Sequence, residues 1–149
     1  MQYGVFSMAS GRFKRSVESS WRGGLRCDIR AGNFVLVADE PKSVGGDDSG
    51  PQPTELLLSA VASCFTLAIA FSAKRLSVEL QHLAVTATGT YDGPRFRAIH
   101  ISARMGCDPS MIDALISRAE SLCYVTNTLR SDVEISVEAA GEPNIAGAP

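Results

Sequence analysis

The sequence is poor in the residue patterns that build metal sites and nucleic-acid interfaces. It has two histidines, and its four cysteines form no Cys-x-x-Cys pair, so a structural zinc site is not expected. Its 14 lysines and arginines are scattered along the chain, and the net charge is −2. Nucleic acids and anionic membranes require a clustered basic surface on their partners. We therefore expect no metal or other cofactor, no nucleic-acid partner and no membrane partner.

A secretory signal is also missing from the sequence. Residues 1–15 contain no sustained apolar core and no small-residue cleavage site behind one. Without export, the cysteines are expected to stay reduced, because disulfides are rare in the cytosol. These cysteines are Cys27, Cys64, Cys107 and Cys123. The sequence thus indicates a cytoplasmic protein with free thiols.

One apolar run dominates what is present. Residues 56–73 carry no charge, and Cys64 lies near their middle. The run is long enough to cross a bilayer, but five alanines, three serines and one threonine weaken insertion into lipid. Pro53 suits a first helical position, Glu55 places negative charge in the first turn, and a basic pair begins at Lys74. These ends are typical of a soluble helix, so we expect protein rather than lipid to cover it.

Two stripes of side chains recur along this helix at alternating spacings of four and three residues. The first is apolar, and its members are Leu57, Val61, Cys64, Ala68 and Phe71. The second consists of small residues, which let another helix approach closely; its members are Ser59, Ser63, Thr66, Ala70 and Ala73. One hypothesis is that one face packs on the chain's own sheet while another meets a helix of a second subunit. A core helix covered by its own chain is the alternative.

The rest of the sequence predicts strands and helices that are segregated rather than strictly alternating. Apolar alternation between Gly- or Pro-containing turns predicts strands at residues 15–24, 25–30, 33–38, 83–91, 95–105 and 133–137. Asp108 followed by Pro109 predicts a second helix to about residue 122, with a short helical turn at residues 127–130. This order is typical of an α+β fold. We expect one domain at residues 15–138, an N-terminal extension at residues 1–14 and a loose tail at residues 139–149.

Two of the thiols lie in patterns that carry more information than a cysteine does alone. A cysteine on an apolar stripe or at a helix end is most simply a small core residue. The patterns are Pro51-x-Pro53-x-Glu55, then Ala62-Ser63-Cys64, and later Cys123-x-Val125-x-x-x-Leu129. In this order they resemble the OsmC/Ohr family of osmotically inducible and organic hydroperoxide resistance proteins. The resemblance covers about residues 17–138.

The resemblance implies an intertwined homodimer in which two long central helices pack together and are wrapped by sheets from both chains. It also implies a thiol-dependent peroxidase that acts on small organic hydroperoxides. Cys64 would be the peroxidatic thiol, which becomes a sulfenic acid, and Cys123 the resolving thiol, which condenses with it to a disulfide. A dithiol reductant, of the lipoyl type in the family's best-known members, would then reduce the disulfide by exchange.

The resemblance is incomplete at the groups that would ionise Cys64. A thiol has a reference pKa near 8.5 and apolar surroundings raise it, so the thiolate needs a cation nearby. In the hydroperoxide resistance branch this cation is an arginine of the N-terminal hairpin, held by a carboxylate. Thr54 stands where that carboxylate is expected, and Cys27 where the arginine is expected. Three arginines of the predicted hairpin are the candidates: Arg22, Arg26 and Arg30. Arg26 is our choice of thiolate partner, and a solvent-exposed hairpin arginine is the alternative.

Glu55 is the remaining candidate among the catalytic residues. It follows the expected carboxylate position directly, and one helical residue is about 100° of rotation, so its side chain would point elsewhere. A helix-terminus carboxylate is a better interpretation of it than a general base. Tyr124 is a further departure, because many family members have proline after the second cysteine. These departures indicate the OsmC-like branch, in which both cysteines are kept and the arginine–carboxylate pair is not evident.

Two other functions stay open from the sequence. The same fold could hold a small apolar ligand as a binding or sensing module, with the cysteines only structural. A thiol-dependent hydrolase or transferase would need a general base near Cys64, and the sequence identifies none. Cys27 and Cys107 receive no role from the sequence.

Overall fold

A computed structural model of the chain describes residues 13–141. The predicted extension at residues 1–14 and the predicted tail at residues 139–149 therefore lie mostly outside the described residues. The chain divides into two units, Met1–Leu57 and Leu58–Pro149, each of which is described by itself. The expected domain at residues 15–138 stays a prediction.

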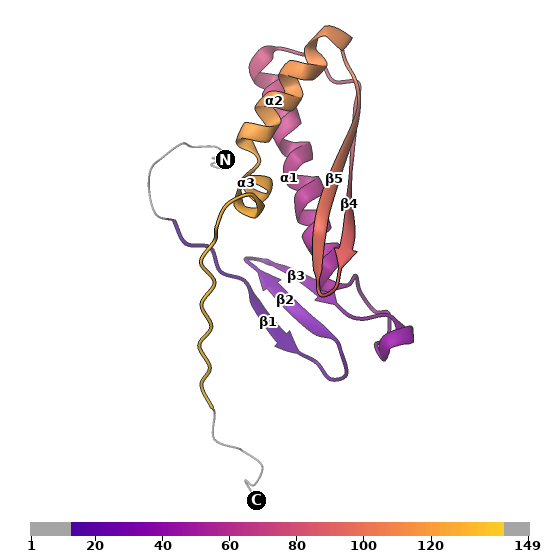
Figure 1. The fold of residues 1–149 in the computed structure, drawn as a ribbon, viewed down its shortest axis with the longest axis vertical. Coiled ribbons are helices and arrows are strands. Elements are labelled where there is room, and N and C mark those ends of the chain that lie inside the picture. The colour runs from indigo at the N-terminus through magenta and orange to yellow at the C-terminus, as the bar shows by residue number, and fades with distance from the viewer. Residues whose placement is uncertain (1–12, 142–149) are drawn as a thin grey trace, which may run out of the picture. The chain divides into compact units, whose positions relative to one another are not determined.

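The first unit contains a three-stranded antiparallel sheet with the strand order β1-β2-β3 (Figure 1). Its strands are β1 (Glu18–Trp21), β2 (Cys27–Ala31) and β3 (Phe34–Ala38), which confirms the strands predicted there. Gly23 and Gly24 have φ angles of +100° and +53°, a conformation that residues with a Cβ rarely adopt. The Arg22 amide donates to the Arg26 carbonyl at 3.0 Å, which closes the turn. Arg22 and Arg26 therefore face each other across the end of the hairpin.

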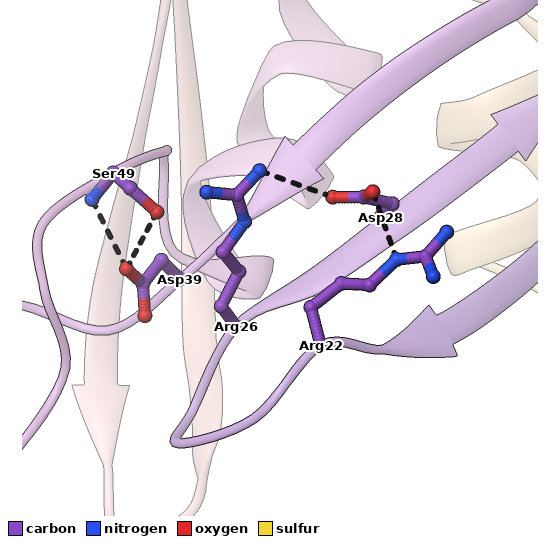
Figure 2. Close-up of polar contacts among 5 residues, drawn as sticks. All are labelled: Arg22, Arg26, Asp28, Asp39 and Ser49. Carbon is purple, nitrogen blue, oxygen red and sulfur yellow. Dashed lines mark hydrogen bonds and ion pairs between the residues drawn. The ribbon is translucent and has the colours of Figure 1, made fainter.

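The loop after β3 is organised by one buried carboxylate, Asp39, which is 1% exposed. It accepts hydrogen bonds from the amides of Glu40, Asp47 and Ser49 and from the Ser49 hydroxyl, at 2.8–3.2 Å. Figure 2 shows the two bonds from Ser49. The two bonds from Ser49 are the largest cause that holds the pKa of Asp39 below its ordinary value. The carboxylate is therefore ionised at neutral pH and fixes the chain between β3 and the long helix.

The long helix α1 runs over Pro53–Leu76, with Lys74 and Arg75 in its last turn as predicted. At its start the Gln52 amide donates to the Glu55 carboxylate at 2.9 Å, which is one half of a capping box, and Pro53 takes the first helical position. At its end Ser77 has a φ of +53°, and the Val78 amide donates to the Ala73 carbonyl at 2.9 Å. Both ends are thus fixed by local sequence.

The second unit packs α1 with a hairpin and a second helix (Figure 1). Strands β4 (His82–Asp92) and β5 (Arg95–Gly106) and helix α2 (Ile112–Leu122) confirm the elements predicted there. The Asp108 side chain caps a 3-10 turn before α2 by accepting from the Ser110 amide. A short helix, α3 (Tyr124–Leu129), begins earlier than the predicted turn. A long helix with antiparallel strands confirms the α+β class.

The apolar core of this unit combines residues from both helices and the hairpin. Its buried members are Phe65, Ala68, Ile69, Ala119 and Cys123. Hairpin side chains such as Leu83 and Ile101 pack against them, and so does Cys64. Because these groups leave water together, the core holds α1, α2 and the hairpin in one arrangement.

Helix α1 buries only part of its apolar surface in this chain. The buried residues are Val61, Phe65, Ala68, Ile69, Ser72 and Ala73. The predicted apolar stripe is right at Val61 and Ala68 and wrong at Leu57, which is 38% exposed, because the buried face is rotated toward Phe65. The small residues Ser59, Ser63 and Ala70 are exposed. Much of the helix surface is therefore left uncovered by the described residues.

No strand forms at residues 133–137, so that prediction is wrong for the chain by itself. Val133, Ile135 and Val137 are 52%, 85% and 87% exposed. Their alternation with polar residues is typical of a strand, but a strand forms only where its backbone groups pair with a neighbour. No described strand of this chain pairs with the segment. Its apolar side chains are therefore covered only in part at Val133 and very little at Ile135 and Val137 by the described residues.

Candidate thiol site

The fold brings Cys64 and Cys123 together, although they are far apart in the sequence. Cys64 is half-buried near the middle of α1, and Cys123 is fully buried. Cys123 is the one residue between α2 and α3, and its backbone is extended (φ −75°, ψ 102°). It belongs to the apolar core on which Cys64 packs, and it lies close enough to Cys64 to shift the pKa of that thiol. Both sulfurs are free thiols.

The surroundings of Cys64 raise the pKa of its thiol above the ordinary value. Loss of water around the sulfur is the largest cause, and the neighbouring Cys123 thiol raises the pKa further. The backbone amides of Val125 and Tyr124 lower it by donating hydrogen bonds to the sulfur. No cation from the described residues is among these causes, so Cys64 in these surroundings is a neutral thiol at neutral pH.

The two amides are functional groups that sequence reasoning missed. Both belong to the first turn of α3, where amides have no partner inside the helix. They direct their N–H groups at the Cys64 sulfur and so favour its charged form. The available signal was Tyr124, because a proline in that place has no N–H to donate.

We expect Tyr124→Pro to raise the pKa of Cys64 further. Losing one hydrogen bond to the thiolate should slow alkylation of Cys64 by iodoacetamide at neutral pH by roughly threefold to tenfold. Proline is tolerated at the first position of a helix, so α3 should persist. The matched control is Tyr124→Ala, which removes the ring and keeps the N–H. The measurement is peptide mass spectrometry of Cys64 alkylation across neutral and alkaline pH. Equal alkylation rates of Cys64 in the two variants would contradict this role of the amide.

The candidate arginines lie on the β1–β2 hairpin, and two of them share one carboxylate (Figure 2). The Arg22 Nε donates to Asp28 Oδ2 at 2.9 Å, and the Arg26 Nη2 donates to Asp28 Oδ1 at 3.4 Å. The Arg26 Nε is buried and has no hydrogen-bond partner among the described residues. Arg30 lies on β2 and is exposed.

Glu55 lies in the first turn of α1, and its carboxylate is held by the backbone amide of Gln52. The Gln52 side chain donates in turn to the Glu40 carboxylate at 2.6 Å. These are the contacts of a helix-terminus carboxylate. Arg26 and Glu55 belong to the first unit and both thiols to the second, so the site residues that the structure brings together are Cys64 and Cys123.

The other two thiols lie outside this pair. Cys27 is half-buried on β2, and Cys107 is half-buried, with its sulfur against the Asp108 carbonyl at 3.5 Å. Within residues 13–141, no three His, Cys, Asp or Glu side chains gather as they would around a metal ion. The chemistry available to the described site is therefore that of two thiols and two amides.

Fold and site together define an α+β protein with one thiol on a long central helix and a second at a helix junction beside it. Residues 46–138, more than half of the chain, match the family of OsmC-like proteins. The chain therefore belongs to the OsmC-like family, as the sequence pattern indicated.

The relatives of the chain include proteins with and without a described role. YmaD of Bacillus subtilis (strain 168), an uncharacterized protein, is 28% identical over 138 residues, which cover 83% of this chain and 91% of YmaD. The crystal structure of an OsmC-like protein from Mycoplasma pneumoniae has a TM-score of 0.73 at 18% identity and covers 82% of this chain and 91% of its own. An organic hydroperoxide resistance protein from Elizabethkingia anophelis has a TM-score of 0.65 at 21% identity, covering 85% and 94%. At these identities the two structures confirm the fold alone.

Helix α1 is long and apolar enough to cross a membrane. The core helix of a soluble protein meets the same criteria of length and composition. Of its most apolar stretch, 33% is buried inside the chain, where Phe65 and Ile69 pack with α2 and the β4–β5 hairpin. The described contacts of α1 are those of a core helix.

Proposed function

We propose that this protein reduces small organic hydroperoxides, with Cys64 as the peroxidatic thiol and Cys123 as the resolving thiol. The observation that carries the proposal is the contact between a half-buried and a fully buried thiol in an apolar core. Membership of the OsmC-like family supports a peroxide-related role, and one structural relative is named as an organic hydroperoxide resistance protein. Apolar surroundings favour alkyl or aryl hydroperoxides over hydrogen peroxide.

The proposed cycle has three steps. The Cys64 thiolate attacks one peroxide oxygen, so that an S–O bond forms, the O–O bond breaks, and the alkoxide takes a proton and leaves as the alcohol. The Cys123 sulfur then attacks the Cys64 sulfenic acid, so that an S–S bond forms and the oxygen leaves as water. A dithiol reductant, proposed to be of the lipoyl type, restores both thiols by two exchanges and becomes a disulfide itself.

The first step needs a charged sulfur, and we assign the role of the stabilising cation to the Arg26 guanidinium. The described neighbours of Cys64 hold its pKa above the ordinary value, and a guanidinium beside the sulfur would lower it. The buried Nε of Arg26 supports this assignment, because it has no partner among the described residues. Glu55 is assigned a supporting part, in which its bond to Gln52 fixes the start of the helix that carries Cys64.

We also propose a soluble, cytoplasmic homodimer in which a second copy covers the apolar surface that one chain leaves exposed. Large apolar side chains are exposed on the sheet at Trp21 and Phe34, on α1 at Leu67, and after α3 at Ile135. Monomeric soluble proteins rarely expose so much apolar surface unless a partner covers it. The exposed small stripe of α1, at Ser59, Ser63 and Ala70, suits close approach of a second helix.

Sedimentation velocity of the full chain at micromolar concentration should show a dimer. A bulky side chain on the small stripe should weaken it, so we expect Ser63→Phe to raise the dissociation constant by about tenfold or more. The matched control is Ser117→Phe, which changes an exposed serine on α2. A stable monomer of the unmodified chain would contradict the dimer.

The proposed function is tested by adding cumene hydroperoxide to reduced protein and mapping the products by mass spectrometry. The expected product is a Cys64–Cys123 disulfide, formed in proportion to the peroxide and accompanied by cumyl alcohol. Thiols that stay untouched in excess peroxide would instead favour a second candidate, a binding or sensing module. The raised pKa of Cys64 is the observation behind that candidate, because it keeps the sulfur neutral.

A further inference from the structure

We infer that Asn127 is a positioning residue for the thiol site, because its side chain stabilises the break between helices α2 and α3 at Cys123. The inference rests on the proposed function, in which Cys64 reacts as a thiolate beside Cys123. It adds to that function an exposed residue of α3, which belongs to the same unit as both thiols.

A single residue, Cys123, interrupts what would otherwise be one helix. Its ψ of 102° is extended, whereas a helical residue has a ψ of about −42°. The Cys123 amide still donates to the Ala119 carbonyl at 2.9 Å, and the Cys123 carbonyl already accepts from the Asn127 amide at 3.0 Å. The break is therefore confined to the hydrogen bonds that would span Cys123.

The break frees amides at the start of α3 and carbonyls at the end of α2. In a continuous α-helix the Val125 amide would donate to the Ser121 carbonyl, four residues earlier. The Tyr124 amide would be used inside the helix in the same way. At the break both amides instead donate to the Cys64 sulfur. The contact between α3 and Cys64 thus depends on another donor for the carbonyls of α2.

Asn127 supplies that donor. Its side-chain Nδ2 donates to the Ser121 carbonyl at 3.1 Å, and so replaces the Val125 amide that a continuous helix would use. Its backbone amide donates to the Cys123 carbonyl, which also accepts from the buried Thr126 hydroxyl at 3.3 Å. Asn127 therefore bonds to carbonyls before and after the Cys123 Cα, and fixes the direction in which α3 leaves α2.

Two other features could hold the helices apart, and neither does so here. The Arg130 Nη2 lies 3.4 Å from the Glu120 Oε1, but these side chains are 62% and 50% exposed, and such pairs contribute little. A proline at position 124 would prevent a continuous helix by its ring and its missing N–H, but the chain has Tyr124 there. Among the described residues, Asn127 makes the polar contact that a continuous helix would not allow.

The test is the pH dependence of Cys64 alkylation by iodoacetamide in the reduced, full-length protein, followed for that residue by peptide mapping. Asn127→Leu keeps a similar size, removes the donor and has a higher helix propensity. We expect the rate at neutral pH to fall about threefold to tenfold, because withdrawal of the two amides raises the pKa of the thiol. Asn127→Gln, which keeps the carboxamide, should restore most of that rate.

A second background separates positioning from a general effect on stability. Tyr124→Pro imposes the break by itself, so adding Asn127→Leu to it should slow Cys64 no further. The matched control is Thr128→Leu, at an exposed neighbour whose hydroxyl donates within α3 to the Tyr124 carbonyl at 2.7 Å; it should leave the rate within about twofold.

Three results would overturn the inference. The first is an unchanged pH profile of Cys64 in Asn127→Leu, with only a lower melting temperature, because that is the result of a purely structural contact. The second is equal slowing by Thr128→Leu, and the third is further slowing of the proline variant by Asn127→Leu.

Failure of this inference is distinguishable from failure of the proposed function. Alkylation needs no peroxide, so a slowed rate in Asn127→Leu would support Asn127 even in a protein that reduced no hydroperoxide. Conversely, Asn127→Leu could leave Cys64 unchanged in a chain that still formed the Cys64–Cys123 disulfide with cumene hydroperoxide. That result would remove Asn127 and leave the peroxidase standing.

Discussion

Replacing Cys64 with serine should lower the turnover of cumene hydroperoxide by about a thousandfold or more. The serine hydroxyl is similar in size, but it is not ionised at neutral pH and cannot be oxidised to a sulfenic acid. The fold should tolerate the change, because α1 already contains Ser59, Ser63 and Ser72. The measurement is hydroperoxide consumption with a dithiol reductant, at equal concentrations of variant and unmodified protein.

The control for this change is a second half-buried thiol outside the pair. Cys107→Ser removes a sulfur that contacts the backbone of Asp108 and should leave turnover within about twofold. If Cys64→Ser kept its turnover, or Cys107→Ser lost it, the assignment of the peroxidatic thiol would be wrong.

Replacing Cys123 with alanine should turn repeated catalysis into about one turnover per chain. Without a resolving thiol, the Cys64 sulfenic acid persists and further peroxide oxidises it to sulfinic and sulfonic acids, which the reductant does not restore. Alanine is preferred to serine because position 123 is fully buried, and an unpaired hydroxyl there would cost about 1–3 kcal/mol. The measurement is the amount of alcohol formed per chain, together with the mass of the Cys64 peptide.

Trapping gives an independent check on the resolving thiol. Dimedone, which reacts with sulfenic acids, should label Cys64 in Cys123→Ala and much less in the unmodified protein. Cys27→Ala serves as the control, because that thiol lies on β2. Undiminished turnover of Cys123→Ala would mean that the reductant attacks the sulfenic acid directly, and Cys123 would then leave the cycle.

Helix α1 shows which features of the fold local sequence can predict. Pro53 and Glu55 predict its first turn correctly, and the basic pair that begins at Lys74 predicts its last turn. The buried face was harder to predict, because it depends on where α2 and the hairpin pack. Phe65 and Ile69, each one residue away from the predicted stripe, are buried by those contacts. Local patterns therefore set the bounds of the helix, and tertiary contacts choose its inner side.

The segment at residues 133–137 shows where the alternation of side chains fails as a predictor. Val133, Ile135 and Val137 have the period of a strand, and yet none is buried. A strand is defined by hydrogen bonds to a neighbour, and the sequence of one segment does not say where that neighbour is.

The thiol site divides in the same way. Cys64 and Cys123 were selected by a family pattern, because no periodicity predicts contact between residues so far apart. The amides of Tyr124 and Val125 belong to the backbone, so the types of the side chains could not predict their contact with Cys64. The grouping of the hairpin arginines with Asp28 depends on the strand register, which the pattern of residue types did not reveal.

The position of Cys123 between two helices has a consequence for the stability of the chain against unfolding. A covalent link from this junction to α1 would close a loop of about 60 residues and, in the chain-entropy account, resist unfolding by about 4 kcal/mol. The oxidised protein would then melt at a higher temperature and yield more slowly to a protease than the reduced one. Each reduction of the disulfide would lower the stability of the fold as it restores the two thiols, so the stability would alternate between two values during the redox cycle.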